Sequence, residues 1–89
     1  MFSVRRVSGG SMLPTLRPGQ IVIAKKPARV AVGDIVVVRH DGLEKIKRVA
    51  KMQDGRIFVT GDNPAASTDS RSFGWLRLGD VCGRLIWPK

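Results

Sequence analysis

Two residues of this chain have the types needed for nucleophilic hydrolysis: Ser11 and Lys47. Ser11 stands in the segment Ser-Gly-Gly-Ser-Met-Leu-Pro-Thr-Leu (residues 8–16), and Lys47 stands in Lys-Ile-Lys-Arg-Val (residues 45–49). A serine hydroxyl becomes a strong nucleophile when a neighbouring base takes its proton, and a neutral lysine amine can be that base. The two segments therefore predict the chemistry of a Ser-Lys hydrolase.

The serine lies on a glycine-rich turn. Gly9 and Gly10 open backbone conformations that other residues avoid, and Pro14 fixes the chain just after the turn. On such a turn the Ser11 hydroxyl can point outward while its own backbone N–H faces the same site and stabilises an oxyanion. A flexible surface loop has the same composition, so this segment alone does not establish catalysis.

The lysine lies on a predicted strand, where successive side chains face opposite sides. Lys45 and Lys47 share a face with Leu43 and Val49. Apolar neighbours lower the pKa of a lysine, so that it can accept a proton near neutral pH. The alternation leaves two questions open. Lys45 is as good a candidate for the base as Lys47. An exposed edge strand whose lysines prevent aggregation has the same pattern.

A third polar segment covers residues 61–74 and begins Gly-Asp-Asn-Pro. Asp69 and Arg71 lie two positions apart and can pair if the segment is extended. Ser67 can hydrogen-bond a neighbouring ammonium group. The alternative is a turn-rich surface loop, to which Asn63-Pro64 contributes.

The segments that connect and position these residues have the pattern of a mainly β fold. Glycines separate short β-branched segments, and His40-Asp41-Gly42 and Gln53-Asp54-Gly55 have the composition of hairpin turns. We expect a small curled or barrel-like antiparallel sheet, with Trp87 in its core and a long loop at residues 62–74. The predicted strands are Gln20–Ala24, Asp34–Arg39, Leu43–Lys51, Arg56–Thr60 and Val81–Trp87.

Composition narrows the class of protein further. A chain of 89 residues predicts a single domain over residues 1–89, and its formal charge of +9 favours acidic partners such as nucleic acid, an anionic membrane surface or an acidic peptide.

The lone Cys82 excludes an internal disulfide and is expected to be a buried thiol. One cysteine and one histidine are too few ligands for an ordinary zinc site, so we expect no metal. No apolar run reaches the ~18 residues of a membrane helix, and no signal peptide is seen, so we expect a soluble protein in the cytoplasm.

Together and in this order, the three segments resemble the type I signal peptidase family of Ser-Lys proteases. Residues 8–16 are similar to that family's nucleophile motif, and Lys47-Arg48-Val49 is similar to its general-base motif. Gly61-Asp62-Asn63, residues 67–71 and Phe73-Gly74 match its last block. Three ordered motifs are much more specific than any one of them.

The resemblance implies a catalytic-core fold of the signal-peptidase type and a role for each site residue. Ser11 would be the nucleophile and oxyanion donor, and Lys47, rather than Lys45, the base. Ser67 would hydrogen-bond the lysine, Asp69 and Arg71 would form a bracing ion pair with Asp62 nearby, and Met12 and Pro14 would contact the substrate. The substrate would be a protein precursor bound as an extended strand, and no cofactor is implied.

The chain departs from the larger members of that family. It has no apolar anchor, and only residues 50–56 follow the base before the next strand. Gly9 stands where some members have a hydroxyl that completes the oxyanion hole, which leaves the second donor in the Gly9–Gly10 region open. In size the chain is most similar to the proteases that remove an N-terminal extension from nickel-containing superoxide dismutase.

Four alternatives remain open, and the first is that the chain is a fragment of a larger protease with a membrane anchor. The second is processing of exported preproteins, with peripheral contact to a membrane. The third is the self-cleaving domain of SOS-type repressors, which also uses serine and lysine. The fourth is a basic, non-enzymatic β-barrel that binds nucleic acid, although its aromatic residues are spread along the chain and base stacking needs them clustered.

Overall fold

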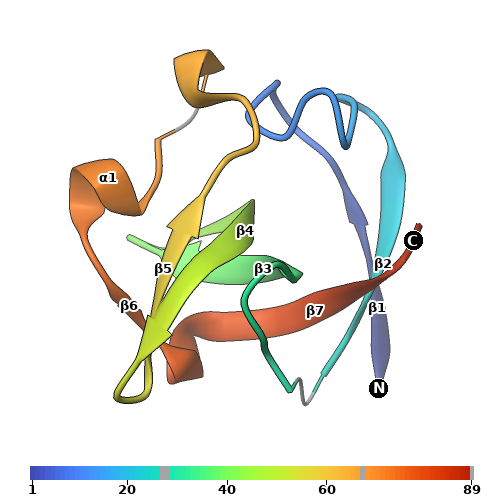
Figure 1. Cartoon of the computed structure of the whole chain (residues 1–89). Coiled ribbons are helices and arrows are strands. Elements are labelled where there is room, and N and C mark those ends of the chain that lie inside the picture. Colours follow the sequence, from blue (N-terminus) through green and yellow to red (C-terminus); the bar gives the residue numbers. More distant parts are fainter. Residues whose placement is uncertain (27–28, 67, 89) are drawn as a thin grey trace.

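The computed structural model describes residues 1–26, 29–66 and 68–88. Seven strands form one antiparallel sheet with the order β1-β2-β7-β3-β4-β5-β6. The sheet is strongly curled and does not close on itself (Figure 1). Its strands are β1 (Phe2–Arg6), β2 (Ile21–Lys25), β3 (Ile35–His40), β4 (Leu43–Gln53), β5 (Arg56–Thr60), β6 (Leu76–Arg77) and β7 (Val81–Trp87).

Two tight hairpins build the centre of the sheet. Asp41 and Gly42 join β3 to β4 with φ values of 52° and 74°, and Asp54 and Gly55 join β4 to β5 with φ values of 51° and 77°. Two positive φ values in a row favour Asp-Gly, because aspartate tolerates this region and glycine enters it freely. The turns fix the register in which Val36 pairs with Lys47.

The core consists of two groups of buried apolar side chains. The first group is Val36, Val38, Val49, Ile57, Val59, Leu76 and Val81. The second is Val7, Met12, Leu16 and Val22, and it lies under the loop between β1 and β2. This second group ties the serine loop to the sheet.

The mainly β, antiparallel fold is confirmed, and each of the five predicted strands is present with its ends shifted by at most two residues. Besides two short 3-10 helices, three elements were not predicted: β1, the two-residue β6 and the one-turn helix α1 (Ser70–Phe73) within the expected long loop. That loop also holds the short 3-10 helix η1 (Pro64–Ala66), and another, η2 (Leu78–Asp80), precedes β7. β1 was not predicted because the alternate residues of its sequence, FSVRR, differ little in polarity between the two faces of the strand.

Two burial predictions were wrong. Trp87 is 54% exposed rather than part of the core, because it ends β7 on the outer side of the sheet. Cys82 is only partly buried, since the buried face of β7 at this point belongs to its neighbours Val81 and Gly83.

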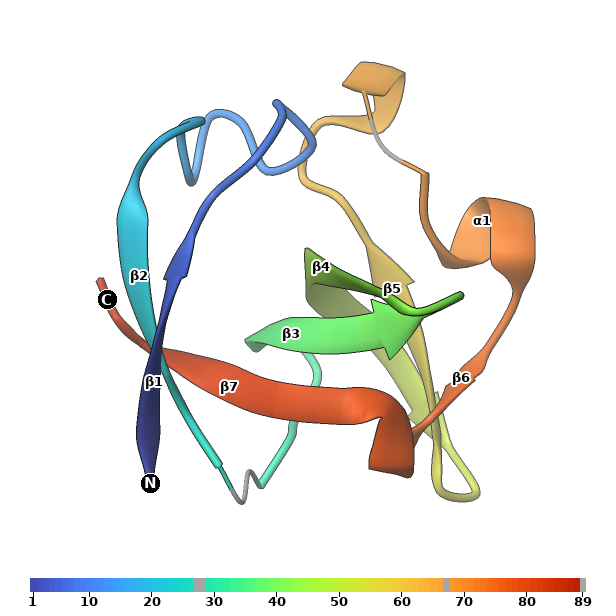
Figure 2. The same ribbon diagram turned by 180° about the vertical axis from the view of Figure 1, so that it is seen from behind.

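None of the helices in the described parts of the chain is long and apolar enough to span a lipid bilayer. Figure 2, the view from behind, shows the helical turns beside the outer edge of β5 and both labelled chain ends beside β1 and β2. The loop between β1 and β2 and the segment after β5 lie close together at one end of the molecule in both views.

Candidate active site

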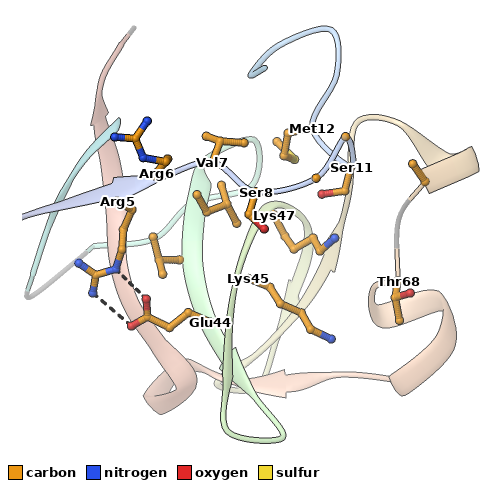
Figure 3. Close-up of a pocket in the computed structure, with 15 residues that line it drawn as sticks. Arg5, Arg6, Val7, Ser8, Ser11, Met12, Glu44, Lys45, Lys47 and Thr68 are labelled. Atoms are coloured by element: carbon orange, nitrogen blue, oxygen red, sulfur yellow. Dashed lines mark hydrogen bonds and ion pairs between the residues drawn. The ribbon is translucent and has the colours of Figure 1, made fainter. Parts of the chain in front are cut away.

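Three segments meet around a cavity of about 330 Å³. They are the end of β1 with the loop that follows it, the first half of β4, and the segment after β5. Ser11 and Lys47 both line this cavity, as do Met12, Ala66 and Thr68. Figure 3 shows Lys47 extending beneath the loop that carries Ser11. The fold thus brings together two side chains that lie 36 positions apart in the sequence.

The Ser11 loop is held from two sides. From below, Met12 and Leu16 are buried at 1% and 2% exposure and anchor the loop in the second core group. From the side, the backbone N–H of Asn63 donates to the Ser11 carbonyl at 2.8 Å, and Asn63 Nδ2 donates to the Gly10 carbonyl at 3.0 Å. The backbone at the serine is therefore fixed on both sides of its Cα.

Gly9 supplies the conformation that the turn needs. Its φ of 72° lies in the left-handed region, which favours glycine. The bond before Pro14 is cis. Pro14 itself is exposed and is not among the residues that line the cavity, so the structure does not place it where the predicted substrate contact would be.

Lys47 is buried on the core-facing side of β4. It is 4% exposed and pairs in register with the fully buried Val36 of β3. Burial lowers the pKa of its ammonium below the ordinary lysine value, and the charges of Lys45 and Arg71 lower it further, while the charge of Asp69 opposes the shift. The neutral amine is therefore more accessible than in an exposed lysine.

Lys45 lies on the same face of β4 but nearer to solvent. Its ammonium sits 4.8 Å from the centre of the Phe73 ring, and Figure 3 shows it directed away from Ser11. The two lysines that strand alternation left equivalent therefore differ in burial and in direction: Lys47 is buried, and Lys45 points to the Phe73 ring.

Asp62 ties the serine loop to β4. Arg48 donates to it through Nε at 2.9 Å and Nη2 at 2.8 Å, and Thr15 Oγ1 donates at 2.6 Å. Hydrogen bonding from Arg48 is the main reason why the pKa of Asp62 is lowered. Arg48 projects from the strand next to Lys47, so this bridge sets the height of the serine loop over the lysine.

Asp69 and Arg71 form the ion pair that was predicted. Arg71 Nε donates to Asp69 Oδ1 at 2.9 Å, while Asp69 caps α1 and accepts the backbone N–H of Gly61 at 2.8 Å. Asp69 is 1% exposed, so its charge is compensated by these donors. The predicted partner of the lysine, Ser67, lies outside the described residues.

A third ion pair stands at the end of the cavity away from Ser11 (Figure 3). Arg5 of β1 donates to Glu44 of β4 through Nε at 2.7 Å and Nη2 at 3.1 Å (Figure 3). Both side chains line the cavity and are about one third exposed. The pair connects the two strands that flank the cavity.

Sequence reasoning missed several residues that build this site. Asn63 and Thr15 were quoted within motifs without a role, and Arg48 was only part of the base motif. Ser70 was overlooked, although its buried hydroxyl accepts the backbone N–H of Val59 at 2.8 Å. Of these residues, only Arg48 could have been assigned a role from the sequence. Its strand position places it on the opposite face of the strand from Lys47, where it can contact another segment.

The arrangement offers a serine hydroxyl and a buried lysine with a lowered pKa, both in the wall of one cavity. Within the described residues, no group of three or more histidine, cysteine, aspartate or glutamate side chains is placed to hold a metal ion. These features suit acyl transfer through serine.

Comparison with known proteins gives a consistent result. The peptidase S24-like family matches residues 3–75. The chain is 30% identical to mitochondrial inner membrane protease subunit 1 of Schizosaccharomyces pombe over 118 residues, which cover 99% of this chain and 75% of the relative. It is 32% identical to the human subunit 1, with 91% of this chain and 67% of the relative covered.

A shorter match of 49 residues is 37% identical to signal peptidase I of Bacillus caldolyticus, and it covers 52% of this chain and 27% of the relative. Coverage of the relatives varies widely, and only 35% of the Saccharomyces cerevisiae subunit 1 is matched.

Proposed function

The chain belongs to the peptidase S24-like family, and we propose that it is a serine endopeptidase in which Ser11 is the nucleophile and Lys47 the general base. The observation that carries this proposal is the burial of Lys47 in the wall of the cavity that Ser11 also lines. Burial favours the neutral form of the lysine, which supports its role as the base, and the shared cavity would give that base a serine to act on.

In the proposed reaction the neutral Lys47 amine takes the proton of Ser11 Oγ as this oxygen attacks the scissile carbonyl carbon. The tetrahedral intermediate collapses, the C–N bond breaks, and the Lys47 ammonium returns the proton to the leaving amine. Lys47 then takes a proton from water, which attacks the acyl-enzyme ester. As the ester C–O bond breaks, the Lys47 ammonium returns this proton to Ser11 Oγ, and both side chains regain their starting state. All protons are accounted for by these two side chains and one water.

The Ser11 backbone N–H is the first oxyanion donor in this proposal, since the Asn63 clamp holds the peptide groups around it. The second donor would come from the Gly9–Gly10 region. Asp62 and Asp69 act through other residues: Asp62 holds the serine loop to Arg48, and Asp69 holds Arg71 and the segment after β5.

The substrate would bind as an extended strand. β5 pairs with β4 only from Arg48 to Gln53, so in the described sheet the segment Leu43–Lys47 pairs with β3 alone. A peptide added beside this open edge runs past Lys47 and under Ser11. Met12, which lines the cavity while packing into the core, would shape the pocket next to the cut.

We propose removal of an N-terminal extension from a protein precursor, with nickel superoxide dismutase precursor as the first substrate to test. The alternative is the processing of exported preproteins, which the names of the relatives, inner membrane protease and signal peptidase, favour. The cytoplasmic location stays a prediction.

The direct test is mass spectrometry of the superoxide dismutase precursor after incubation with the protein, with Ser11→Ala and with Lys47→Met. A single cut that both variants abolish supports the enzyme and the substrate. A cut in a signal-peptide-bearing precursor alone would support the enzyme and replace the substrate, and turnover by either variant would contradict the Ser-Lys mechanism.

Self-cleavage is the competing activity of a Ser-Lys domain. Incubation of the pure protein alone at alkaline pH, followed by intact-mass measurement, separates the two activities. We expect an unchanged mass, whereas a cut that is independent of protein concentration would favour an intramolecular reaction.

A further inference from the structure

We propose that the outer face of β4, β5 and β6 binds an acidic segment of a protein partner. This face, called the aromatic–basic patch below, combines two aromatic rings with three cations. Its residues are Lys51, Arg56, Phe58, Trp75 and Arg77.

Strand register places the patch on one face of the sheet. Phe58 of β5 is directly opposite Lys51 of β4. Arg56 of β5 is directly opposite Arg77 of β6. Antiparallel partners that stand opposite one another share a face. The alternate residues of β5 are fully buried in the first core group, so the patch lies on the outer face.

A bulge in β4 turns Lys51 toward this face. The register shifts between Val49 and Lys51, where Ala50 is the extra residue. Without this shift Lys51 would share the buried face of Val49, since residues two apart lie on one side of a strand. Bulges redirect side chains in this way. The Lys51 ammonium comes to lie 5.3 Å from the centre of the Phe58 ring.

Trp75 supplies an apolar anchor. It directly precedes β6, and its ring meets the Phe58 ring at 65° with centroids 5.4 Å apart. Trp75 remains 39% exposed and lines, together with Arg56, a surface cavity of about 370 Å³. Tryptophan and arginine are the residue types that most often dominate the energy of protein interfaces.

The two arginines of the patch repel one another. Like charges directly opposite across a sheet destabilise it, and Arg56 and Arg77 are such a pair. Neither guanidinium forms an ion pair with an acidic side chain in the described parts of the chain. A carboxylate bound between them removes the repulsion and accepts charge-assisted hydrogen bonds from both.

Nearby acidic residues leave these cations available. Asp54 lines the cavity, and Asp80 accepts the backbone N–H of Arg77 at 3.1 Å. Neither carboxylate lies within ion-pair distance of the three described basic side chains of the patch. Lys51 and both arginines are exposed, and the whole chain carries +9. A ligand with several carboxylates therefore complements the patch.

An acidic polypeptide fits the patch better than nucleic acid does. Single strands stack successive bases on several open aromatic faces. Here Phe58 is only partly exposed and already contacts Lys51 and Trp75, so Trp75 is the ring left open in the patch. One apolar residue flanked by carboxylates matches one open ring among cations.

A short segment fits better than a folded partner. Stable protein interfaces use about 20–30 residues on each side, and the patch has far fewer. A second copy of the chain, docked by the same face around a two-fold axis, would place these cations against themselves.

Docking at the patch leaves the active-site cavity accessible. The cavity is lined by β4 from Glu44 to Lys47, whereas the patch begins at Lys51 in the other half of the strand. A partner held by the patch can present another part of its chain to the cavity. The inference concerns binding, and it stands whether or not Ser11 and Lys47 cleave peptides.

Trp75 reports on the patch directly. In a background of Ser11→Ala and Trp87→Phe, Trp75 is the single tryptophan and no probe can be cut by Ser11. The probes are peptides with one central leucine flanked by glutamates, by glutamines or by lysines. We expect the glutamate peptide alone to shift the Trp75 fluorescence to shorter wavelength, and added salt to reverse the shift.

Matched variants locate the contact. Arg56→Gln combined with Arg77→Gln should weaken binding of the glutamate peptide about tenfold, because two carboxylate contacts are lost. Arg17→Gln combined with Arg29→Gln is the control, since it removes the same charge from exposed loop positions outside the patch. The control should weaken binding less than about twofold. Trp75→Ala, measured by calorimetry, should weaken it about tenfold, and circular dichroism verifies folding.

Several results would overturn the proposal. Absence of a Trp75 shift, or an equal shift with the glutamine peptide, would mean that carboxylates are not the ligand. Equal weakening in the control pair would assign the binding to the overall charge. Tighter binding of an oligothymidylate, with quenching of Trp75, would identify single-stranded nucleic acid as the occupant. Self-association that the patch variants abolish in sedimentation would identify a second copy of the chain.

Discussion

Lys47 couples the pH dependence of catalysis to that of stability. The base acts only when neutral, so the rate should rise with pH through the Lys47 pKa, which burial places below the ordinary lysine value. Initial rates on a cleavable peptide across neutral to alkaline pH test this expectation. A rising limb at the pKa of an ordinary exposed lysine would contradict a buried general base.

The same lysine should make the free energy of unfolding increase with pH. At low pH Lys47 is charged in both states, and the folded state bears the whole cost of burying that charge. As pH rises through the lowered folded pKa, the unfolded chain binds more protons, so unfolding becomes less favourable. Urea titrations of Lys47→Met should lack this rise, and Lys45→Met, on the same face, should keep it.

Asp62 should change stability with pH in the same direction as Lys47, but in the acidic range. Its pKa is lowered, chiefly by hydrogen bonds from Arg48, so its contribution is present above the ordinary aspartate pKa and is lost as pH falls through the folded value. We expect Asp62→Asn to cost about 1–2 kcal/mol at neutral pH and to flatten the acid limb of the stability profile. Asp41→Asn, at an exposed turn, is the control.

Within the segment after β5, a hydroxyl group sets the position of α1. Ser70 is 3% exposed and accepts the backbone N–H of Val59, so Ser70→Ala should leave a buried donor unpaired and cost about 1–3 kcal/mol. Ser72→Ala, two residues on and exposed, should change stability by less than about 0.5 kcal/mol. Equal effects in thermal unfolding would contradict the role given to Ser70.

Sequence patterns predicted the elements whose chemistry is local. The two Asp-Gly turns and the β-branched segments specify β3, β4 and β5, because positive φ and strand alternation depend on neighbours in the chain. β1 could not be predicted, since its place depends on pairing with β2 some twenty residues away. Its sequence carries arginines where a buried strand would be apolar.

At the site, too, local sequence patterns predicted residues but not the contacts between distant segments. Ser11 and Lys47 were found because they lie in motifs, but the contacts that bring their segments together were not. Asn63 reaches Gly10 across 53 positions, and Thr15 reaches Asp62 across 47. Such contacts follow from the way the sheet curls, which no local pattern encodes.

For the molecule as a whole, the Arg5–Glu44 pair connects the first strand to the central hairpin across one end of the cavity. Each side chain is about one third exposed, so we expect Glu44→Gln to change stability by less than about 1 kcal/mol. Its larger effect should be on selectivity, since Glu44 is the sole acidic residue among the described residues that line the cavity.

With Glu44 neutralised, Arg5 is free to attract substrate carboxylates, and kcat/KM for acidic over basic peptides should rise severalfold. Competition between two peptides that differ only in one charged residue measures this ratio. An unchanged ratio would mean that the substrate does not approach this end of the cavity. Arg39→Gln, whose guanidinium also reaches Glu44 but does not line the cavity, is the matched control.

The turn at Asp54-Gly55 lies at the far end of β4 from the serine loop (Figure 1). Lys47 is held by its pairing with β3, whereas this turn joins β4 to β5 and contacts η2 through the Gly55 carbonyl, which accepts the Leu78 N–H at 3.0 Å. The chain can therefore be lengthened here without moving the dyad. A grafted peptide tag, or an entire recognition module, would change which proteins are delivered to the cavity and leave the chemistry in place.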